Sequence, residues 1–543
     1  MDFQELKNTA FNLVTSGDSS VADYLTCYRQ TENYKEKLLK ELPEYTRHLR
    51  VAFLSNFTIQ GLPEVFKVQG IFHNLWLETY LAPYNQYAQE ILNPDSGLNK
   101  FKPELVYFIL DPIENQLSQL YDLAFSILEK TRAKKVVFLS TRMSSFGNNE
   151  FIKFVNLSER LSELGLGHHW NTKYKELADM RLAPDALPAL SEELMKDAVA
   201  VSGATKKCLV TDLDNTLWQG IVGEDDEIVP KEELQRKILT LYEQGIVLAI
   251  NSRNNEADVF QIIDNHPKMI LRKDHFAAWR INWQDKVQNM GELAQEMNLG
   301  LESFVFIDDD PFQQNAVQAS YPEITVLSPE QLENYSGFFG FGITEEDKGR
   351  GRMYTEERKR RALQASLKTV HDFLRELNLQ ALIKFADSGS LPRIAQLTQK
   401  TNQFNLATRR YSEGEIKKSL DGGSKIWTLQ AQDKFGDYGI VGVAMVEPRG
   451  ELWRIDNFML SCRILGRGIE KTFLNFVLET AREAGAKTVA GEFIPTAKNK
   501  PCATFYADNN FEFKGRAGDT NLYHYDLKSF NVDYPNFIKV TFV

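Results

Sequence analysis

The sequence predicts an α/β protein of three domains, with a parallel sheet in the central one. The chain has 543 residues, which at roughly 100–200 residues per domain suggests three domains. In the first two blocks of the chain, short apolar runs alternate with long amphipathic stretches, a pattern typical of β-α units on a parallel sheet. After a basic stretch at residues 348–361 and a helix, the pattern turns to strands, which indicates a mixed-sheet or α+β domain.

Each predicted domain rests on its own set of strand-like runs. Residues 1–200 contain apolar runs at 51–55, 105–110 and 135–140. Residues 201–345 repeat the same rhythm with runs at 207–213, 245–251 and 303–309. Residues 346–543 contain runs at 438–447 and 451–460, followed by a helix from about Gly468. These ranges are the predicted domain boundaries.

Composition and charge exclude several classes of protein. The chain is 43% hydrophobic and 25% charged, as in ordinary globular proteins, and its net charge of −11 argues against a nucleic-acid binder. No apolar run reaches the roughly 18 residues of a bilayer span, and the first residues do not resemble a signal peptide. The cysteines form neither a metal-binding spacing nor a disulfide framework: Cys27, Cys208, Cys462 and Cys502. We therefore expect a cytoplasmic protein that contacts neither nucleic acid nor membrane.

The chemistry of the central domain centres on CLVTDLDNTLWQG, where an apolar strand ends in acidic residues. Ligands of open parallel sheets bind beyond the carboxyl ends of the strands, so Asp212 emerges at the reactive edge. A carboxylate there can attack phosphorus and form an aspartyl-phosphate. Asp214, two residues on, lies on the same side of the extended chain and can act as acid and base. The motif therefore predicts phosphoryl transfer.

An anionic nucleophile that attacks an anionic phosphate requires a cation between them. Mg²⁺ suits such a site, because it binds a few carboxylates together with phosphate oxygens. A second strand, FVFIDDDP, ends in Asp308 and Asp309 and supplies further acids. Ser252 ends the strand GIVLAINS and can hydrogen-bond a phosphate oxygen, while Lys286 can neutralise charge on the phosphorylated intermediate.

In order and spacing, DLDNT, Ser252, Lys286 and DDD resemble the four motifs of the haloacid dehalogenase superfamily. The resemblance implies a Rossmannoid parallel sheet, with Asp212 as nucleophile and Asp214 as acid/base. It assigns metal binding to Asp212, the main-chain carbonyl of Asp214 and Asp308, with Asp309 as a supporting acid. About 40 residues separate Asp212 from Ser252, and about 34 separate Ser252 from Lys286, which leaves room for little or no cap domain.

The flanking sequence is similar to the FkbH-like family within that superfamily. The similar segments cover much of residues 200–530 and lie at 217–225, 265–286, 300–311, 400–411, 434–442 and 461–470. The resemblance implies an enzyme of polyketide or related biosynthesis. Such an enzyme dephosphorylates a phosphorylated three-carbon acyl donor such as 1,3-bisphosphoglycerate and passes the glyceryl or similar group to the phosphopantetheine thiol of an acyl carrier protein. The first 200 residues look more loosely like the SGNH-hydrolase-like domain of longer members.

One departure from the family concerns the acyl-site position. The family's second strand usually reads close to AVCSKND, and its cysteine is thought to hold the acyl group; here Asn251 takes that place and cannot form a thioester. Cys208 lies in the first apolar strand, where a core role is expected. Either the acyl group passes directly to the carrier, the acceptor differs, or the protein is a Mg²⁺-dependent phosphatase of a small metabolite. Gln219 also replaces a glycine frequent in the family and belongs to a predicted flap.

In the third block, RILGRG at residues 463–468 follows a strand and opens a helix. It resembles the R-x-x-G-x-G loop of Gcn5-related N-acetyltransferases, and Tyr506 matches a tyrosine on that fold's next helix. Glycines let the backbone approach a pyrophosphate, and the helix N-terminus favours an anion. Because coenzyme A and carrier proteins share the phosphopantetheine arm, Arg463, Gly466 and Gly468 are a hypothetical site for the carrier's arm.

Two further features have weaker functional interpretations. The basic stretch at residues 348–361 could steer an acidic carrier protein, although a solvated helix face is the simpler reading. In the first block, Ser55 and Asn56 follow one strand and Asp111 another, and with His168 or His169 they could form a hydrolase site. A clear GDS-type block is missing, so a structural or carrier-docking role is expected there.

Overall fold

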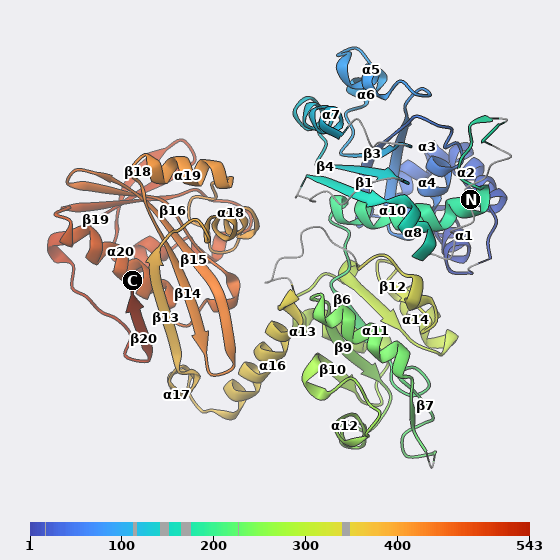
Figure 1. Ribbon diagram of the computed structural model, residues 1–543. Coiled ribbons are helices and arrows are strands. Elements are labelled where there is room, and N and C mark those ends of the chain that lie inside the picture. Colours follow the sequence, from blue (N-terminus) through green and yellow to red (C-terminus); the bar gives the residue numbers. More distant parts are fainter. Residues whose placement is uncertain are drawn as a thin grey trace. The chain divides into compact units, whose positions relative to one another are not determined.

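The computed structural model describes residues 1–16, 18–111, 117–141, 151–163, 175–176, 178–225, 227–338 and 348–543 (Figure 1). The chain divides into two compact units, Met1–Tyr354 and Thr355–Val543. The first unit contains two separate parallel sheets, and the second contains one large mixed sheet. The predicted α/β class with parallel sheets is confirmed, while the boundaries of three domains stay a prediction. None of the described helices combines the length and apolar character required to cross a bilayer.

The first sheet of unit 1 has the strand order β2-β1-β3-β4-β5, with every neighbouring pair parallel. Helices α4 and α10 pack on one face, and α7 packs on the other. The strands are β1 (Arg47–Ser55), β2 (Leu75–Leu81), β3 (Leu105–Ile109), β4 (Lys135–Ser140) and β5 (Ile152–Asn156). The helices are α1 (Phe3–Thr15), α2 (Val21–Asn33), α3 (Lys35–Glu41), α4 (Leu62–Phe72), α5 (Tyr87–Leu92), α6 (Gly97–Phe101), α7 (Leu117–Lys130), α8 (Leu157–Glu163) and α10 (Leu187–Ser202).

The second sheet of unit 1 has the order β10-β9-β6-β11-β12 and is parallel throughout. Its strands are β6 (Cys208–Thr211), β9 (Val247–Ser252), β10 (Phe276–Ile281), β11 (Phe304–Ile307) and β12 (Thr325–Leu327). The chain winds from β6 to β9 and β10 on one side, then crosses to β11 on the other. The switch point therefore lies between β6 and β11, where open α/β sheets form their ligand crevice.

Helices cover both faces of this second sheet, so its strands are apolar on both sides. Side chains of α11 (Glu232–Glu243) and α12 (Glu256–Asn265) belong to one buried cluster, and those of α13 (Lys286–Met297) and α14 (Pro311–Ser320) to the other. Between β6 and α11, the described strands are only the two-residue pair β7 (Trp218–Gln219) and β8 (Val229–Pro230). The described part of this connection is thus a small hairpin rather than a cap domain.

Unit 2 is built on a sheet of order β18-β19-β17-β16-β15-β14-β13-β20, antiparallel except for the β13–β20 and β16–β17 pairs. Its strands are β13 (Leu379–Phe385), β14 (Lys425–Asp433), β15 (Gly436–Arg449), β16 (Leu452–Leu460), β17 (Thr488–Phe493), β18 (Glu512–Ala517), β19 (Thr520–Asp526) and β20 (Ile538–Phe542). Its helices are α17 (Val370–Leu377), α18 (Leu391–Lys400), α19 (Glu413–Asp421), α20 (Ile469–Glu483) and α21 (Phe505–Asp508), preceded by α16 (Arg350–Ser366), which contains the division between units.

Candidate active site

Asp212 directly follows the last residue of β6, at the switch point of the second sheet. Its amide donates to the Ile307 carbonyl at 2.9 Å, which continues the β6–β11 pairing by one residue and fixes the carboxylate beside the end of β11. Asp308, the first residue after β11, is 0% exposed, and Asp212 is also buried. The structure thus brings two of the predicted acidic residues together, away from bulk water.

Lys286 joins these two carboxylates. Its Nζ lies 2.8 Å from Asp212 Oδ1 and 2.7 Å from Asp308 Oδ2, and the side chain is buried. The lysine is the first residue of α13, and the carboxylate of Asp285 caps this helix by accepting from the Val287 amide at 2.7 Å. Burial lowers the pKa of Lys286, but Asp212 and Asp308 outweigh it and raise the pKa, so the ammonium stays charged.

One ammonium does not balance two buried carboxylates. Burial raises the pKa of Asp212, although Lys286 and a hydrogen bond from the Ser252 hydroxyl act in the opposite direction. Burial, followed by the charge of Asp212, raises the pKa of Asp308 to about 6. The cluster therefore has an excess of negative charge that a bound cation would relieve.

A third carboxylate completes a set with metal-binding geometry. Oxygen atoms of Asp212, Asp308 and Asp309 lie within 4.8 Å of one another. Asp309 is exposed, and its carboxylate accepts a hydrogen bond from Thr216 Oγ1 at 3.1 Å. Hard carboxylate oxygens in a partly open cluster fit Mg²⁺, which prefers few protein ligands and keeps positions for phosphate oxygens or water. The residues present therefore fit the magnesium ion that the sequence predicts, with Asp309 in the set of carboxylates.

Asp214 is held next to this cluster by three hydrogen bonds. Its Oδ1 accepts from the indole of Trp218 at 2.9 Å and from the Val222 amide at 3.2 Å, and its Oδ2 accepts from Asn254 Nδ2 at 2.8 Å. Burial raises the pKa of Asp214, while Trp218 and Val222 lower it, with a net increase. A raised pKa favours the protonated form of this carboxyl, which is the form that a general acid requires.

The sequence signals did not identify Trp218 and Asn254, which orient Asp214, while Thr216, which donates to Asp309, belongs to the DLDNT motif itself. Trp218, Asn254 and Thr216 lie within or directly after the motif strands, so their proximity to the motifs was visible. Their polar contacts depend on how the β7–β8 hairpin and the loop after β9 fold back over the strand ends. The loop from β6 itself requires a left-handed residue, Asn215 at φ 56°, whose Oδ1 accepts from the Gly220 amide at 3.1 Å.

Asn251, the predicted acyl-site position, is a buried structural residue here. It is 0% exposed, its Nδ2 donates to the Lys286 carbonyl at 2.9 Å, and its Oδ1 accepts from Asn289 Nδ2 at 3.1 Å. Ser252, the next residue, is also buried and hydrogen-bonds Asp212. Asn251 therefore ties β9 to the first turns of α13, while Ser252 contacts the predicted nucleophile.

The cysteines provide no thiol at this site within the described residues. Cys208 is fully buried in the sheet core, and burial raises its pKa far above the ordinary value. Cys27 and Cys502 are buried elsewhere, and the exposed Cys462 belongs to unit 2. This agrees with a core role for Cys208.

In unit 2, the backbone of the RILGRG loop has left-handed glycines and leads directly into a helix, as the sequence pattern predicts. Gly466 and Gly468 have φ values of 76° and 78°, and Gly468 precedes the first residue of α20. The carboxylate of Glu470 accepts from the Gly466 amide, and a hydrogen bond from the Gly468 amide also lowers its pKa. Burial nevertheless raises the pKa of Glu470 overall. An internal carboxylate thus occupies the amide groups that an anionic ligand of this loop would use.

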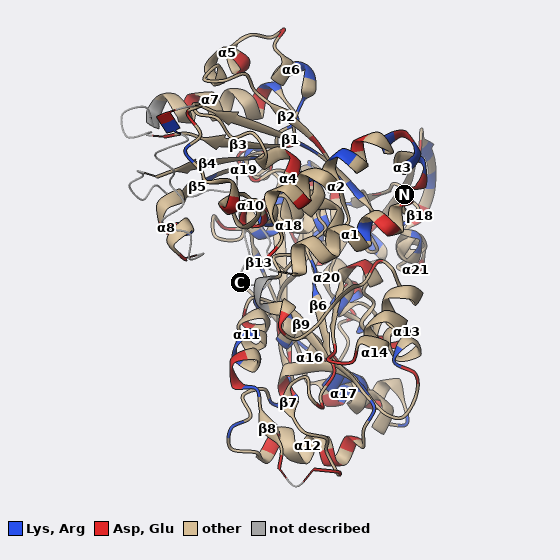
Figure 2. Cartoon of the chain, turned by 90° about the vertical axis from the view of Figure 1, so that its right-hand side faces the viewer, with Lys and Arg blue, Asp and Glu red and all other residues tan. Residues whose placement is uncertain are grey.

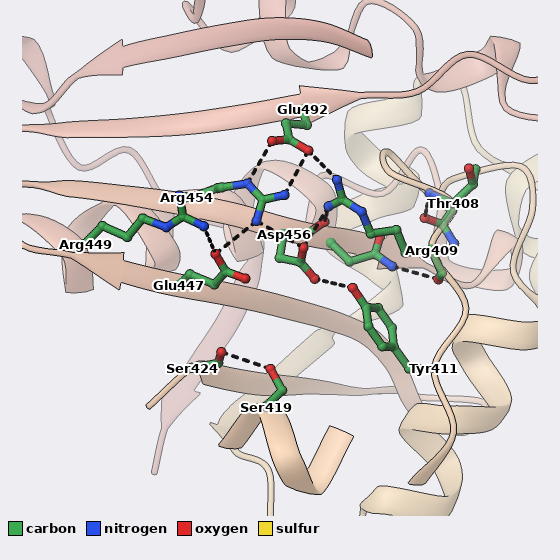
Figure 3. A network of polar contacts seen from close by, with 12 residues as sticks. Thr408, Arg409, Tyr411, Ser419, Ser424, Glu447, Arg449, Arg454, Asp456 and Glu492 are labelled. Carbon is green, nitrogen blue, oxygen red and sulfur yellow. Dashed lines mark hydrogen bonds and ion pairs between the residues drawn. The ribbon is translucent and has the colours of Figure 1, made fainter. Parts of the chain in front are cut away.

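Unit 2 also contains a network of charged residues at the point where strands β16 and β17 separate (Figure 3). Arg409 donates to Asp456 Oδ1 at 2.7 Å and to Glu492 Oε2 at 2.5 Å, and Arg454 donates to Glu492 Oε1 at 2.8 Å. Tyr411 donates to Asp456 Oδ2 at 2.5 Å. Upstream of Arg409, the amide of Leu406 donates to the Phe458 carbonyl of β16. The carbonyl of Leu406 accepts from the amide of Ile494, the residue that follows β17. The network fastens this segment of chain between the two strands.

Tyr506 and Arg360, a residue of the basic stretch, are both buried in unit 2. Tyr506 is buried among aromatic rings of unit 2, and burial raises its pKa far above the ordinary value. Arg360 is buried and forms a two-pronged ion pair with Asp433, at 2.7 and 3.0 Å. That residue is therefore neither a solvated helix face nor an exposed docking charge.

The candidate triad of the first sheet is not assembled within the described residues. Ser55 is buried, and its hydroxyl donates to the Ile109 carbonyl at 2.8 Å. Asn56 exchanges two hydrogen bonds with the backbone of Asp111, and Asp111 pairs with Arg181 at 3.2 Å. His168 and His169 lie outside the described residues. The contacts that can be seen support a structural role for Ser55 and Asp111.

Comparison with known proteins gave similarities of limited extent. No family model matches the chain, and no curated protein matches it. The N-terminal part of a Bacteroides fragilis protein, containing a phosphatase domain complexed with Mg, is 23% identical, with a TM-score of 0.47; the match covers 63% of this chain and 100% of that one. The ribosomal-protein-S18-alanine N-acetyltransferase of Escherichia coli is 12% identical over 27% of this chain and 94% of its own, with a TM-score of 0.23. A GNAT-family acetyltransferase of Staphylococcus aureus is 14% identical over 27% of this chain and 99% of its own, with a TM-score of 0.22.

Proposed function

We propose that the chain is a magnesium-dependent enzyme of the haloacid dehalogenase type that acts on a phosphorylated three-carbon acyl donor similar to 1,3-bisphosphoglycerate. The observation behind the proposal is the buried cluster of Asp212, Asp308 and Lys286 at the switch point of a parallel sheet, with Asp309 beside it. A magnesium ion held by the three carboxylates would neutralise the substrate phosphate. The acyl acceptor that we propose is the phosphopantetheine thiol of an acyl carrier protein.

The residues around the cluster divide the work of phosphoryl transfer. Asp212 Oδ attacks phosphorus while the bond from phosphorus to the leaving oxygen breaks, and Lys286 stabilises the charge that develops. Asp214 gives a proton to the leaving oxygen when that oxygen requires one, and later takes a proton from the attacking water. Ser252 keeps Asp212 oriented through its hydroxyl. The water attacks the phosphorus of the aspartyl-phosphate and the bond from phosphorus to Asp212 breaks, so the products are phosphate and the dephosphorylated donor.

An acyl phosphate has a second reactive centre, and attack there gives transfer instead of hydrolysis. If the carrier's thiolate sulfur attacks the carbonyl carbon, the carbon–oxygen bond breaks and phosphate leaves, so the acyl group becomes a thioester. The same cluster would then hold the departing phosphate. Because the described site lacks a cysteine and Asn251 is buried, transfer in this protein would be direct.

Access to the site supports a macromolecular acceptor. The described connection after β6 is a small hairpin, and two large aromatic side chains are strongly exposed in the loops of the same sheet edge. Trp283, between β10 and α13, is 77% exposed, and Phe312, in the first turn of α14, is 72% exposed. Exposed rings beside a reactive site are frequent in protein–protein interfaces.

The alternative function is a phosphatase of a small phosphorylated metabolite, favoured by the absence of a thiol among the described residues of the site. Incubation with 1,3-bisphosphoglycerate, Mg²⁺ and candidate carrier proteins, followed by intact mass measurement, separates the two. A mass gain of one glyceryl group supports transfer, while phosphate release with unmodified carriers supports hydrolysis. Asp212→Asn should stop phosphate release. Asp258→Asn, which changes an exposed acid on α12, is the matched control.

We also propose that the loop of Arg463, Gly466 and Gly468 receives the phosphate of the carrier's arm. The positive φ values of the two glycines and the N-terminus of α20 suit an anion, but the ligand must first displace Glu470 from the loop's amides. A bulky residue at Gly466 should then abolish transfer and leave phosphate release intact. Unchanged transfer would rule the loop out.

A further inference from the structure

The loops at the reactive edge of the second sheet have an unbalanced charge. These loops follow β6, β9, β10 and β11, and cover residues 212–217, 253–255, 282–285 and 308–310, all of them described. They contain six acids, Asp212, Asp214, Asp285, Asp308, Asp309 and Asp310, and a single basic residue, Arg253. More acidic residues lie around β8 and α12 (Figure 2). An anionic substrate that approaches this edge meets strong repulsion unless cations receive it.

Two other cations lie near this edge, and both are already engaged. Lys231 donates to the Asn215 carbonyl at 2.5 Å, and Lys286 pairs with the two reactive carboxylates. The ammonium of Lys286 is buried between Asp212 and Asp308, at 2.8 and 2.7 Å. It cannot leave them without leaving two buried carboxylates unpaired. A magnesium ion would serve the phosphoryl group that reacts. None of these charges is free for a second anionic group on the substrate.

Arg253 lies between two residues that contact the reactive carboxylates. Ser252 hydrogen-bonds Asp212, and Asn254 Nδ2 lies 2.8 Å from Asp214 Oδ2. The side chain of Arg253 is exposed and makes neither an ion pair nor a hydrogen bond to any residue in the described part of the chain. Basic residues in acidic surroundings usually form such pairs, as Arg280 does with Glu292 and Glu296 at 2.8 Å each.

We propose that Arg253 binds a second anionic group of the donor, a phosphate or carboxylate separate from the phosphoryl group that reacts. This inference rests on the proposed function and narrows the substrate to a compound with two anionic ends. The guanidinium suits the role because its planar donors bind two oxygens of a phosphate or carboxylate at once. A donor with one anionic group would gain much less from this residue, so Arg253 determines specificity.

The first test compares two donors on the full-length protein with Mg²⁺. Acetyl phosphate has one anionic end and 1,3-bisphosphoglycerate has two. In Arg253→Ala, the preference for the second donor, measured as the ratio of kcat/KM values, should fall roughly ten- to hundred-fold, the worth of a charged hydrogen bond. The fall should arise mainly from KM, and Arg253→Lys should restore only part of it. Arg236→Ala, an exposed arginine paired with Glu232 on α11, is the matched control and should leave the ratio unchanged.

The second test measures binding without turnover. Calorimetric titration of 3-phosphoglycerate into Mg²⁺-loaded Asp212→Asn protein should give a Kd at least about ten-fold lower than the same titration with Arg253→Ala added. If Arg253→Ala binds 3-phosphoglycerate as well as its parent does, including no binding by either, Arg253 is an ordinary solvated arginine and the inference is overturned. Failure of the proposed function has a different signature, since phosphate release would then survive Asp212→Asn.

Discussion

Replacement of Asn251 by alanine tests the structural role that this buried residue has at the predicted acyl-site position. The substitution removes the hydrogen bond from Nδ2 to the Lys286 carbonyl and the one from Asn289 Nδ2 to Oδ1, both fully buried. Each is worth about 1 kcal/mol, and the cavity left by the carboxamide adds about another. Asn289 keeps its 3.0 Å hydrogen bond to Asn282, which limits the loss. We expect local destabilisation of about 2–3 kcal/mol.

The local measurement is hydrogen exchange of the amides in α13, followed by mass spectrometry. A loss of about 2–3 kcal/mol corresponds to exchange that is roughly 30- to 150-fold faster where local opening controls the rate. Because α13 begins with Lys286, kcat for phosphate release should also fall, while exchange of the amides in unit 2 should not change. Unit 2 therefore serves as the internal control.

Two matched variants sharpen the test of Asn251. Asn251→Asp has nearly the same size but cannot donate to the Lys286 carbonyl and adds a charge at a fully buried position, so it should cost more than Asn251→Ala. Asn251→Cys introduces a thiol at the predicted acyl-site position, and burial should keep this thiol from trapping an acyl group. If Asn251→Ala exchanges and turns over like the parent protein, or if Asn251→Cys accumulates an acyl adduct, the position faces the substrate and our reasoning is wrong.

Four further predictions concern single residues. Asp212→Asn should lower phosphate release at least about 10³-fold in a phosphate-release assay, since a carboxamide is a poor nucleophile. Because the pKa of Asp308 is raised to about 6, its carboxyl in the folded metal-free protein holds a proton between about pH 4 and 6, where the unfolded chain has lost it. The contribution of this proton to stability therefore falls as pH rises through that window. The Mg²⁺ affinity, measured by calorimetry, should rise with pH up to about 6 and then level off. Glu470→Gln should strengthen coenzyme A binding in a titration if the RILGRG loop accepts a phosphate, and leave it unchanged if it does not. Arg409→Met should lower the stability of unit 2 by about 2 kcal/mol and speed exchange at residues 404–411, because Asp456 and Glu492 lose a charged partner.

The strands that carry the chemistry were predictable from the sequence because their signals are local. The apolar runs at residues 207–213, 245–251 and 303–309 correspond to β6, β9 and β11, each shifted by a few residues at its ends. Parallel strands place their carboxyl ends at one edge, so acids that follow two neighbouring strands must meet. Asp212 and Asp308 meet for this reason. Lys286 contacts both of them from the first residue of α13, the helix that follows β10.

The predicted roles that the structure leaves in doubt all involve residues whose partners are distant in sequence. Asn251 was assigned the acyl-site position by resemblance to a family motif, yet its hydrogen bonds are made to α13, which begins 35 residues later. In the RILGRG loop, the glycine pattern correctly predicted the left-handed backbone conformation of Gly466 and Gly468. The Gly466 amide, however, donates to the carboxylate of Glu470 in the first turn of α20. A glycine pattern describes where an anion can bind, and the neighbouring side chains decide which anion does.

The same physical distinction explains why Arg253 invites a functional hypothesis and Arg360 does not. Both arginines have acids close by along the chain. Folding brings Asp433, 73 residues away, against Arg360, and the resulting ion pair links α16 to the end of β14 within unit 2. Folding brings no partner to Arg253 within the described residues, although six carboxylates share its edge of the sheet. An unpaired cation among these acids can offset their repulsion of an anionic substrate, which is the role that we propose for Arg253.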